Sequence, residues 1–174
     1  MTTINFEDDV KINIDKRGKI IKNKIVTEEY DLDGRLIKSY VLNNKNEYNG
    51  PYYQKTFLDG EIIFLLKATY LDGKLHGVYE IYKYTNSVLY YSERSMYLNG
   101  LLEGSESIKQ TFTRHTYSSF YFYKAGLKHG PFRLVTHTET TEGNYKNGKL
   151  DGFVVITLSD DSSTIHVYQD GNEL

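Results

Sequence analysis

The chain has 174 residues, a formal net charge of −2, 17 tyrosines, 2 prolines, and neither cysteine nor tryptophan. This length fits one domain, the lack of cysteine excludes disulfides and thiolate metal sites, and the slightly acidic balance argues against a general electrostatic affinity for nucleic acid. The longest apolar run, Ile62–Leu66, is too short to cross a bilayer, and the acidic residues 1–9 do not resemble a signal peptide. We therefore expect a cytoplasmic, intracellular protein.

The first 42 residues predict an irregular start followed by degenerate hairpins. Residues 1–9 show no strand pattern, and we expect them to form a lead-in that caps the first unit. Turn signals at residues 16–19 and 31–34, each containing a glycine, predict two hairpins within residues 10–42. This part of the chain therefore predicts a less regular form of the pattern that follows.

Residues 43–174 carry a repeated motif, in which an aromatic residue is followed three residues later by a glycine and four residues after that by another. The copies are Tyr70 with Gly73 and Gly77, Tyr97 with Gly100 and Gly104, Tyr123 with Gly126 and Gly130, Tyr145 with Gly148 and Gly152, and a truncated Tyr168 with Gly171. A degraded copy starts at Asn43, with Asn46 and Gly50 in the glycine positions, and asparagine tolerates left-handed backbone. Recurrence at this spacing indicates a repeat architecture.

Each interval between the glycine pairs predicts two strands around a turn. Runs rich in aromatic and β-branched residues flank turns at 85–87, 113–115 and 160–163, which is the pattern of hairpins. No segment shows a sustained apolar stripe of helical period. We therefore predict an all-β fold made of successive hairpins.

The alternation along the predicted strands indicates which face of the sheet is packed. Two residues after the second glycine of each copy stand Tyr52, Tyr79, Glu106, Phe132 and Val154, and two residues before the repeated tyrosines stand Ala68, Ser95, Tyr121, Gly143 and His166. Three of the latter are small, which leaves room for a ring from a neighbouring strand to lie against the backbone. We interpret the repeated tyrosines as packing between successive hairpins.

Three segments resemble the membrane occupation and recognition nexus (MORN) repeat. They are Glu142–Gly152, with the sequence EGNYKNGKLDG, and the turns Lys74–Gly77 and Leu127–Gly130. Many members of that family carry a further glycine where this chain has Tyr79, Phe132 and Val154, and the longer units here are similar to a divergent variant found in bacterial antitoxin-like proteins and large DNA viruses. The resemblance implies one MORN-repeat domain over residues 1–174, clearest over 43–174, with a single antiparallel sheet in meander order, wound as an elongated, twisted, open ribbon.

The chain offers no constellation that indicates catalysis. His137 and Glu139 would share a strand face as half of a metal site, but nothing near them in the sequence completes it. Gly73 and Gly77 precede a strand and lack the lysine of a phosphate-binding loop. We therefore expect no enzyme, no catalytic or metal site, no cofactor and no small-molecule substrate.

The preferred functional hypothesis is a non-catalytic protein-interaction or scaffold module, with an antitoxin-like or viral role as the resemblance suggests. Its basis is an aromatic surface that one thin sheet cannot bury completely, because exposed rings with polar tips are suited to interfaces. The proposed contact residues are Tyr53, Tyr82, Tyr84, Tyr90, Tyr91, Phe120 and Phe122, next to Tyr123. For any single ring, packing within the ribbon is the ordinary alternative.

Other partners are expected with less support. Recognition of anionic lipid headgroups, which the family name suggests, would use the cluster of Lys11, Lys16, Arg17, Lys19, Lys22 and Lys24. Single-stranded nucleic acid on stacked rings is disfavoured by the acidic balance. A homodimer through the edge of the terminal repeat follows from the resemblance, because members of that family dimerise end to end, and from the uncovered unit around Gly171.

Overall fold

The computed structural model describes residues 3–5, 11–13 and 25–174. The strands are β1 (Thr3–Asn5), β2 (Lys11–Asn13), β3 (Ile25–Tyr30), β4 (Leu36–Leu42), β5 (Tyr48–Leu58), β6 (Glu61–Leu71), β7 (Lys74–Leu75), β8 (Gly77–Thr85), β9 (Val88–Leu98), β10 (Leu101–Phe112), β11 (His115–Lys124), β12 (Leu127–Val135), β13 (Glu139–Lys146), β14 (Lys149–Leu150), β15 (Gly152–Leu158), β16 (Ser163–Gln169) and β17 (Asn172–Glu173).

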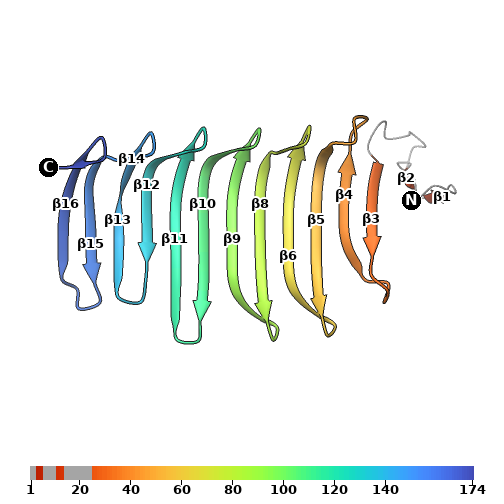
Figure 1. Ribbon diagram of the computed structural model, residues 1–174, viewed down its shortest axis with the longest axis horizontal. Helices are drawn as coiled ribbons and strands as arrows, with labels where there is room; N and C mark the ends of the chain where they lie inside the picture. The colour runs from red at the N-terminus through yellow and green to blue at the C-terminus, as the bar shows by residue number, and fades with distance from the viewer. Residues whose placement is uncertain (1–2, 6–10, 14–24) are drawn as a thin grey trace.

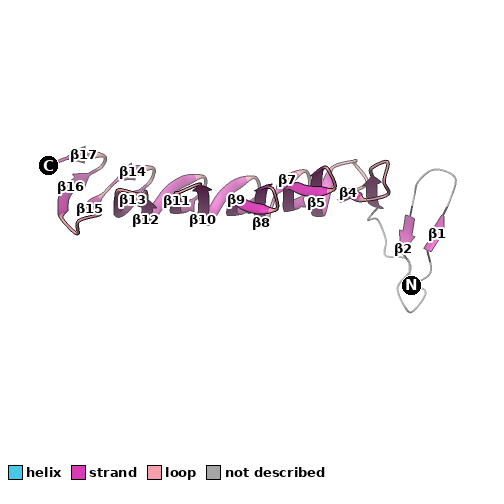
Figure 2. Ribbon diagram, turned by 90° about the horizontal axis from the view of Figure 1, so that it is seen from below, coloured by secondary structure: helices cyan, strands magenta, loops and turns pink. Residues whose placement is uncertain are grey.

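The prediction of an all-β meander is confirmed, and the described residues contain no helix. Strands β3 to β17 form a single antiparallel sheet of 15 strands that does not close into a barrel. Figure 1 shows the strands side by side in chain order, and Figure 2, turned by a quarter, shows that the sheet is one layer thick. β1 and β2 pair with each other, and Lys11 of β2 pairs with Val26 of β3. The expected turn at residues 16–19 lies outside the described residues, whereas the one at 31–34 is present.

The turns that contain the first glycine of each motif copy lie along one edge of the sheet (Figure 1). The two turn residues Asp72 and Gly73 both have positive φ angles, 46° and 76°. Positive φ at both positions is characteristic of a type I′ turn, whose twist matches that of the flanking strands in a two-residue hairpin. The amide of Gly73 also donates a hydrogen bond to the carbonyl of Tyr48 in the preceding unit, at 2.9 Å. Corresponding bonds join Gly100 to Leu75, Gly126 to Leu102, Gly148 to Lys128 and Gly171 to Leu150. The motif therefore forms a turn and links it to the unit before it.

The second glycine of each copy lies directly opposite a repeated tyrosine in the sheet. The pairs are Gly50 with Tyr70, Gly77 with Tyr97, Gly104 with Tyr123, Gly130 with Tyr145, and Gly152 with Tyr168. All five glycines have positive φ, between 89° and 129°. Next to these glycines the pattern of hydrogen bonds between neighbouring strands is irregular. At the interruptions, the amide of His76 donates to the carbonyl of Thr69, and the amide of Asp151 donates to the carbonyl of Asn144. The second glycine is thus the bulge position at which each strand changes direction.

The cross-strand register divides the side chains between two faces. We call the face that carries the repeated tyrosines the tyrosine face; it also carries Tyr52, Ala68, Tyr79, Ser95, Glu106, Tyr121, Phe132, Gly143 and Val154, as the pairings and the strand alternation require. The other side, the opposite face, carries Tyr53, Lys67, Tyr82, Arg94, Ser107, Lys109, Phe120, Phe122, Arg133 and Phe153.

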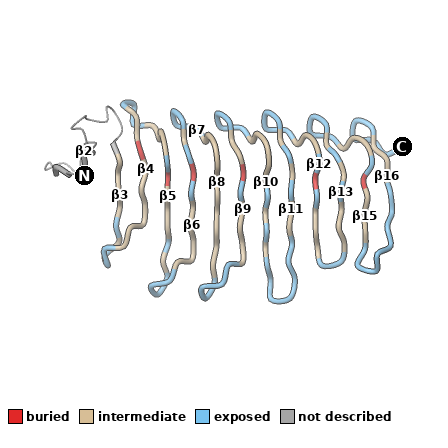
Figure 3. Tube along the Cα trace, turned by 180° about the vertical axis from the view of Figure 1, so that it is seen from behind, coloured by how far each residue is buried: buried red, intermediate tan, exposed pale blue. Residues whose placement is uncertain are grey.

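The buried positions form a band across the sheet (Figure 3). The buried side chains are Val41, Tyr52, Ala68, Ser95, Phe132 and Val154. The predicted pairing of rings with small residues is confirmed, because Tyr52 is opposite Ala68, Tyr79 opposite Ser95, and Phe132 opposite Gly143. The other described side chains are half-buried or exposed, since a single layer covers each residue with its lateral neighbours alone.

Candidate interaction surfaces

The residues proposed as an interaction surface from the sequence do not form one patch. Tyr53, Tyr82, Phe120 and Phe122 lie on the opposite face, as their pairings with Lys67, Ser92, Ser107 and Ser105 place them. Tyr91 pairs with Lys83 and Gln110 on the tyrosine face. Tyr84 and Tyr90 line a shallow hollow beside the turn at Asp59, next to a register shift between β8 and β9. The structure thus brings four of the seven residues to one face.

On the tyrosine face the rings contact one another. Tyr48 lies 5.3 Å from Tyr52 and 5.2 Å from Tyr70, measured between ring centroids. Further along, Phe132 lies 4.9 Å from Tyr145 and 6.0 Å from Tyr121. Lysines from the same face lie over these clusters, with Lys38 Nζ 4.9 Å from the centroid of Tyr40 and Lys128 Nζ 3.5 Å from that of Tyr121. The rings of these clusters therefore find their aromatic and cationic partners within the chain itself.

Two glutamates accept hydrogen bonds from hydroxyl groups on the tyrosine face. The hydroxyl of Tyr91 donates to Glu93 Oε2 at 2.9 Å, and that of Tyr123 donates to Glu106 Oε2, also at 2.9 Å. Burial and the bond to Glu93 raise the pKa of Tyr91 to about 12. Burial and the bond to Glu106 likewise raise the pKa of Tyr123. Both hydroxyl groups are therefore donors held in place by carboxylates, and not free contact groups.

Because the pKa of Tyr91 is about 12 in the folded protein and ~10 in an unfolded chain, alkaline pH should destabilise the fold. The folded state retains a proton that the unfolded state loses, so this stabilisation is complete below pH ~10 and is lost as pH rises toward ~12. A difference titration of tyrosinate absorbance between the wild type and Tyr91→Phe should show one hydroxyl titrating near 12. Glu93→Gln should move it closer to 10, and a wild-type midpoint already at ~10 would contradict the assignment.

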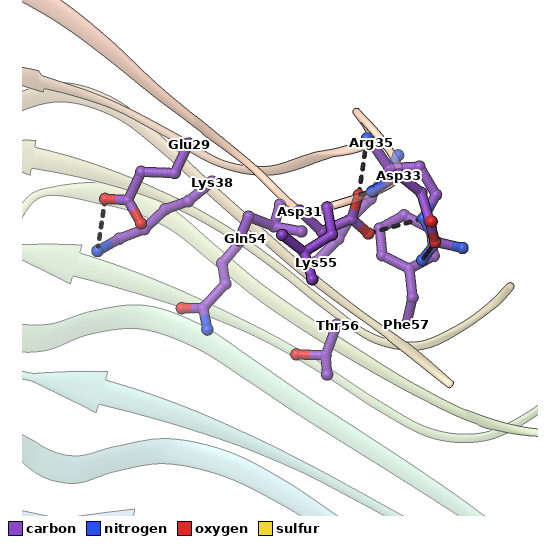
Figure 4. Close-up of a pocket in the computed structure, with 11 residues that line it drawn as sticks. Glu29, Asp31, Asp33, Arg35, Lys38, Gln54, Lys55, Thr56 and Phe57 are labelled. Atoms are coloured by element: carbon purple, nitrogen blue, oxygen red, sulfur yellow. Dashed lines mark hydrogen bonds and ion pairs between the residues drawn. The ribbon is translucent and has the colours of Figure 1, made fainter. Parts of the chain in front are cut away.

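A hollow of about 660 Å³ lies at the turn between β3 and β4, and several of its lining residues contact one another (Figure 4). Arg35 Nε lies 2.7 Å from Asp31 Oδ2, its Nη2 lies 2.7 Å from Asp33 Oδ2, and its guanidinium carbon lies 4.7 Å from the centroid of the Phe57 ring. Although burial opposes it, hydrogen bonding to the backbone and side chain of Arg35 lowers the pKa of Asp31. This cluster fixes the turn against β5, and the charges of Arg35, Asp31 and Asp33 offset one another within the chain.

The opposite face has a second hollow, of about 450 Å³, over the middle of β8 to β12. It is lined on this face by Tyr82, Ser92, Arg94, Ser107, Lys109, Ser118, Phe120 and Arg133, which we call the basic hollow. Three serines from three strands form its floor, and two aromatic rings and three cations form its walls. The sequence analysis singled out two of these residues, Tyr82 and Phe120. The others went unnoticed because their convergence depends on cross-strand register.

The described residues also bear on the metal-binding and lipid-binding hypotheses. No group of three or more histidine, cysteine, aspartate or glutamate side chains there could hold a metal. His137 instead lies 4.3 Å from His115, measured between ring centroids. The basic cluster between Lys11 and Lys24, proposed for lipid binding, has no described side chains. In the described part of the chain no helix has the length and apolar character needed to span a membrane.

Comparison with known proteins adds no assignment. No family model matches the chain, and no curated protein matches its sequence. The functional argument therefore rests on the two faces of the sheet.

Proposed function

We propose that the protein is a non-catalytic interaction module that binds another protein on the opposite face of its sheet. The observation that carries this proposal is the contrast between the two faces. The central rings of the tyrosine face pack on one another and contact carboxylates or lysines, and the exposed apolar residues of that face, Phe112, Tyr117 and Leu158, lie at or near strand ends. On the opposite face, large apolar side chains are exposed around the Phe120–Phe122 pair and in the C-terminal hairpin. Phe120 and Phe122 are each 36% exposed, Phe153 66% and Ile165 64%.

The composition of the opposite face supports a protein partner. Phe120 and Phe122 form an edge-to-face pair with centroids 5.2 Å apart. Arg133 lies opposite Phe120 in the adjacent strand β12, and Arg94 lies two strands away in β9, opposite Ser107. Aromatic residues and arginine are the types most enriched at the energetic centres of protein interfaces. Exposed apolar groups that nothing in the described chain covers are a typical mark of such interfaces.

We also propose that the chain is a divergent MORN-repeat array. This is supported by the MORN-like segments Lys74–Gly77 and Leu127–Gly130, each of which directly follows a two-residue turn at the same edge of the sheet. The proposal of a binding module does not depend on this membership, because it rests on the exposed side chains of the opposite face.

A photo-crosslinking experiment in lysate of the source organism tests the function. Benzoylphenylalanine in place of Phe120 should give one discrete adduct that excess unlabelled protein suppresses. Benzoylphenylalanine in place of Tyr97, on the tyrosine face, or in place of Asn86, in an exposed turn, should give little crosslinked adduct. Equal adducts at all three positions, or none at Phe120, would contradict the proposal.

A further inference from the structure

We infer that the basic hollow is the subsite for an acidic segment of the protein partner, with the carboxylates seated over the serine floor. This inference rests on the proposed function, because it specifies what the opposite face binds. It requires a hollow that is open, cationic and without an internal anion, and a surrounding surface that selects a peptide segment over other anions.

The hollow exists because short side chains meet in the sheet. Lys109 of β10 pairs with Ser92 of β9 on one side and with Ser118 of β11 on the other. Two residues along β10, Ser107 pairs with Arg94 and with Phe120. Serine hydroxyls therefore form a floor below the longer side chains, and each hydroxyl can donate a hydrogen bond to an oxyanion.

The three cations of the hollow retain donors for a ligand. Arg94 uses Nε to contact Glu80 Oε1 at 3.1 Å, and Arg133 uses Nε to contact Glu142 Oε1 at 3.4 Å. Neither carboxylate lines the hollow, although Glu80 shares β8 with the lining residue Tyr82, and each contact uses only Nε, so the terminal nitrogens of each guanidinium remain for a second anion. Lys109 has no ion pair within the described part of the chain.

Among the described residues that line the hollow, none has an acidic side chain on this face. Glu93 belongs to a strand that lines the hollow, but its side chain lies on the tyrosine face, where its carboxylate accepts hydrogen bonds from the hydroxyl groups of Tyr91 and Ser95. Lys109 is the diagonal neighbour of Arg94 across β9 and β10, a separation of ~7–8 Å at which like charges disfavour each other. A bound carboxylate would offset this repulsion and gain charge-assisted hydrogen bonds.

The surroundings favour a narrow peptide over an extended anionic surface. Glu80 and Glu142 lie one strand beyond Arg94 and Arg133, so a bilayer or a nucleic acid duplex laid across the face would meet both carboxylates. A segment that follows the strand direction between them avoids this contact. Its apolar side chains can also cover Tyr82 and Phe120, which a free inorganic anion would leave exposed.

The test uses the full chain and the peptide acetyl-Glu-Leu-Glu-Leu-Glu-amide, with the glutamine counterpart as its neutral control. Binding is followed by NMR shifts of the backbone amides of β9 to β12. We expect the acidic peptide to bind at least about tenfold more tightly than its counterpart, because each charge-assisted bond accounts for about that factor. Shifts should centre on Ser107 and Lys109 and weaken with added salt.

Variants distinguish the hollow from general charge. Lys109→Gln and Arg133→Gln should each weaken binding of the acidic peptide about five- to tenfold. Lys146→Gln is the matched control, since this exposed lysine lies on the opposite face but outside the hollow. Ser107→Tyr, which fills the floor while keeping all three cations, should abolish binding, and circular dichroism checks that each variant is folded.

Several results would overturn the inference. These are equal affinity for the two peptides, equal loss in the Lys146→Gln control, or tighter binding of inorganic phosphate, phosphatidylserine vesicles or an oligonucleotide than of the acidic peptide. If crosslinking from position 120 succeeds but the acidic peptide does not bind, the acidic subsite is wrong while the proposed function stands. If the peptide binds at Lys109 but position 120 forms no adduct in lysate, the subsite stands and the proposed function is wrong.

Discussion

Replacing Gly143 with valine is expected to lower the free energy of unfolding by about 3 kcal/mol, at the upper end of overpacking effects. A Cβ atom at this position would lie 2.8 Å from Phe132 Cε1 and 3.0 Å from Val154 Cγ2. Both neighbours are buried, and the Phe132 ring is itself held against Tyr121 and Tyr145. The ring therefore cannot move aside without disturbing Tyr121 in β11 and Tyr145 in β13.

This prediction opposes intrinsic strand propensity, since valine is favoured in strands and glycine is not. Asn144→Val is the matched control, because Asn144 is the next residue of β13 but lies exposed on the opposite face. We expect the control to change stability by no more than about 0.5 kcal/mol. Urea denaturation followed by circular dichroism measures both, and equal effects of the two variants would show that Gly143 is not a packing site.

Replacing Gly130 with alanine is expected to cost about 2 kcal/mol, for a different physical reason. Its φ is +94°, and an added Cβ would meet only Phe122 Cβ, at an ordinary 3.6 Å. The cost therefore comes from the backbone, which L-residues adopt at this φ only with strain. Urea denaturation measures this cost, and an unchanged stability would show that the bulge tolerates a side chain.

A companion substitution should act in the opposite direction. Ala125 has a φ of +50° in a turn where other motif copies have Asn99 and Asn147 at 52° and 51°. Asparagine adopts this left-handed region at lower cost than alanine. Ala125→Asn should therefore raise the free energy of unfolding by about 0.5–1 kcal/mol, and a loss of stability would contradict this explanation.

The local features of the fold were predictable because each depends on few neighbouring residues. A two-residue hairpin turn needs positive φ at consecutive positions, which asparagine, aspartate and glycine provide, as at Asp72 and Gly73. The strand alternation placed Ala68, Ser95 and Gly143 opposite rings of a neighbouring strand, and the register confirms it. Both inferences follow from the backbone geometry of a hairpin.

The interaction surface was predictable only in part. Tyr91 was proposed as a contact residue, but its hydroxyl bonds to Glu93 on the face where the rings pack together. The register shift between Lys83 and Tyr84 leaves Tyr90 out of the ladder and separates it from Tyr82. Counting tyrosines cannot reveal such shifts, because a bulge changes which side of the sheet the following residues face.

The sequence by itself determined the repeat, its turns, the all-β class and the alternation of packed and mixed positions, since these are encoded within a single hairpin. Only the tertiary structure decided which aromatic rings share a face and that Ser92, Ser107 and Ser118 form one floor beside Arg94, Lys109 and Arg133. Those residues belong to four strands, so their meeting depends on the register between hairpins. That register is set jointly by the turns, the bulges and the packing of the whole sheet.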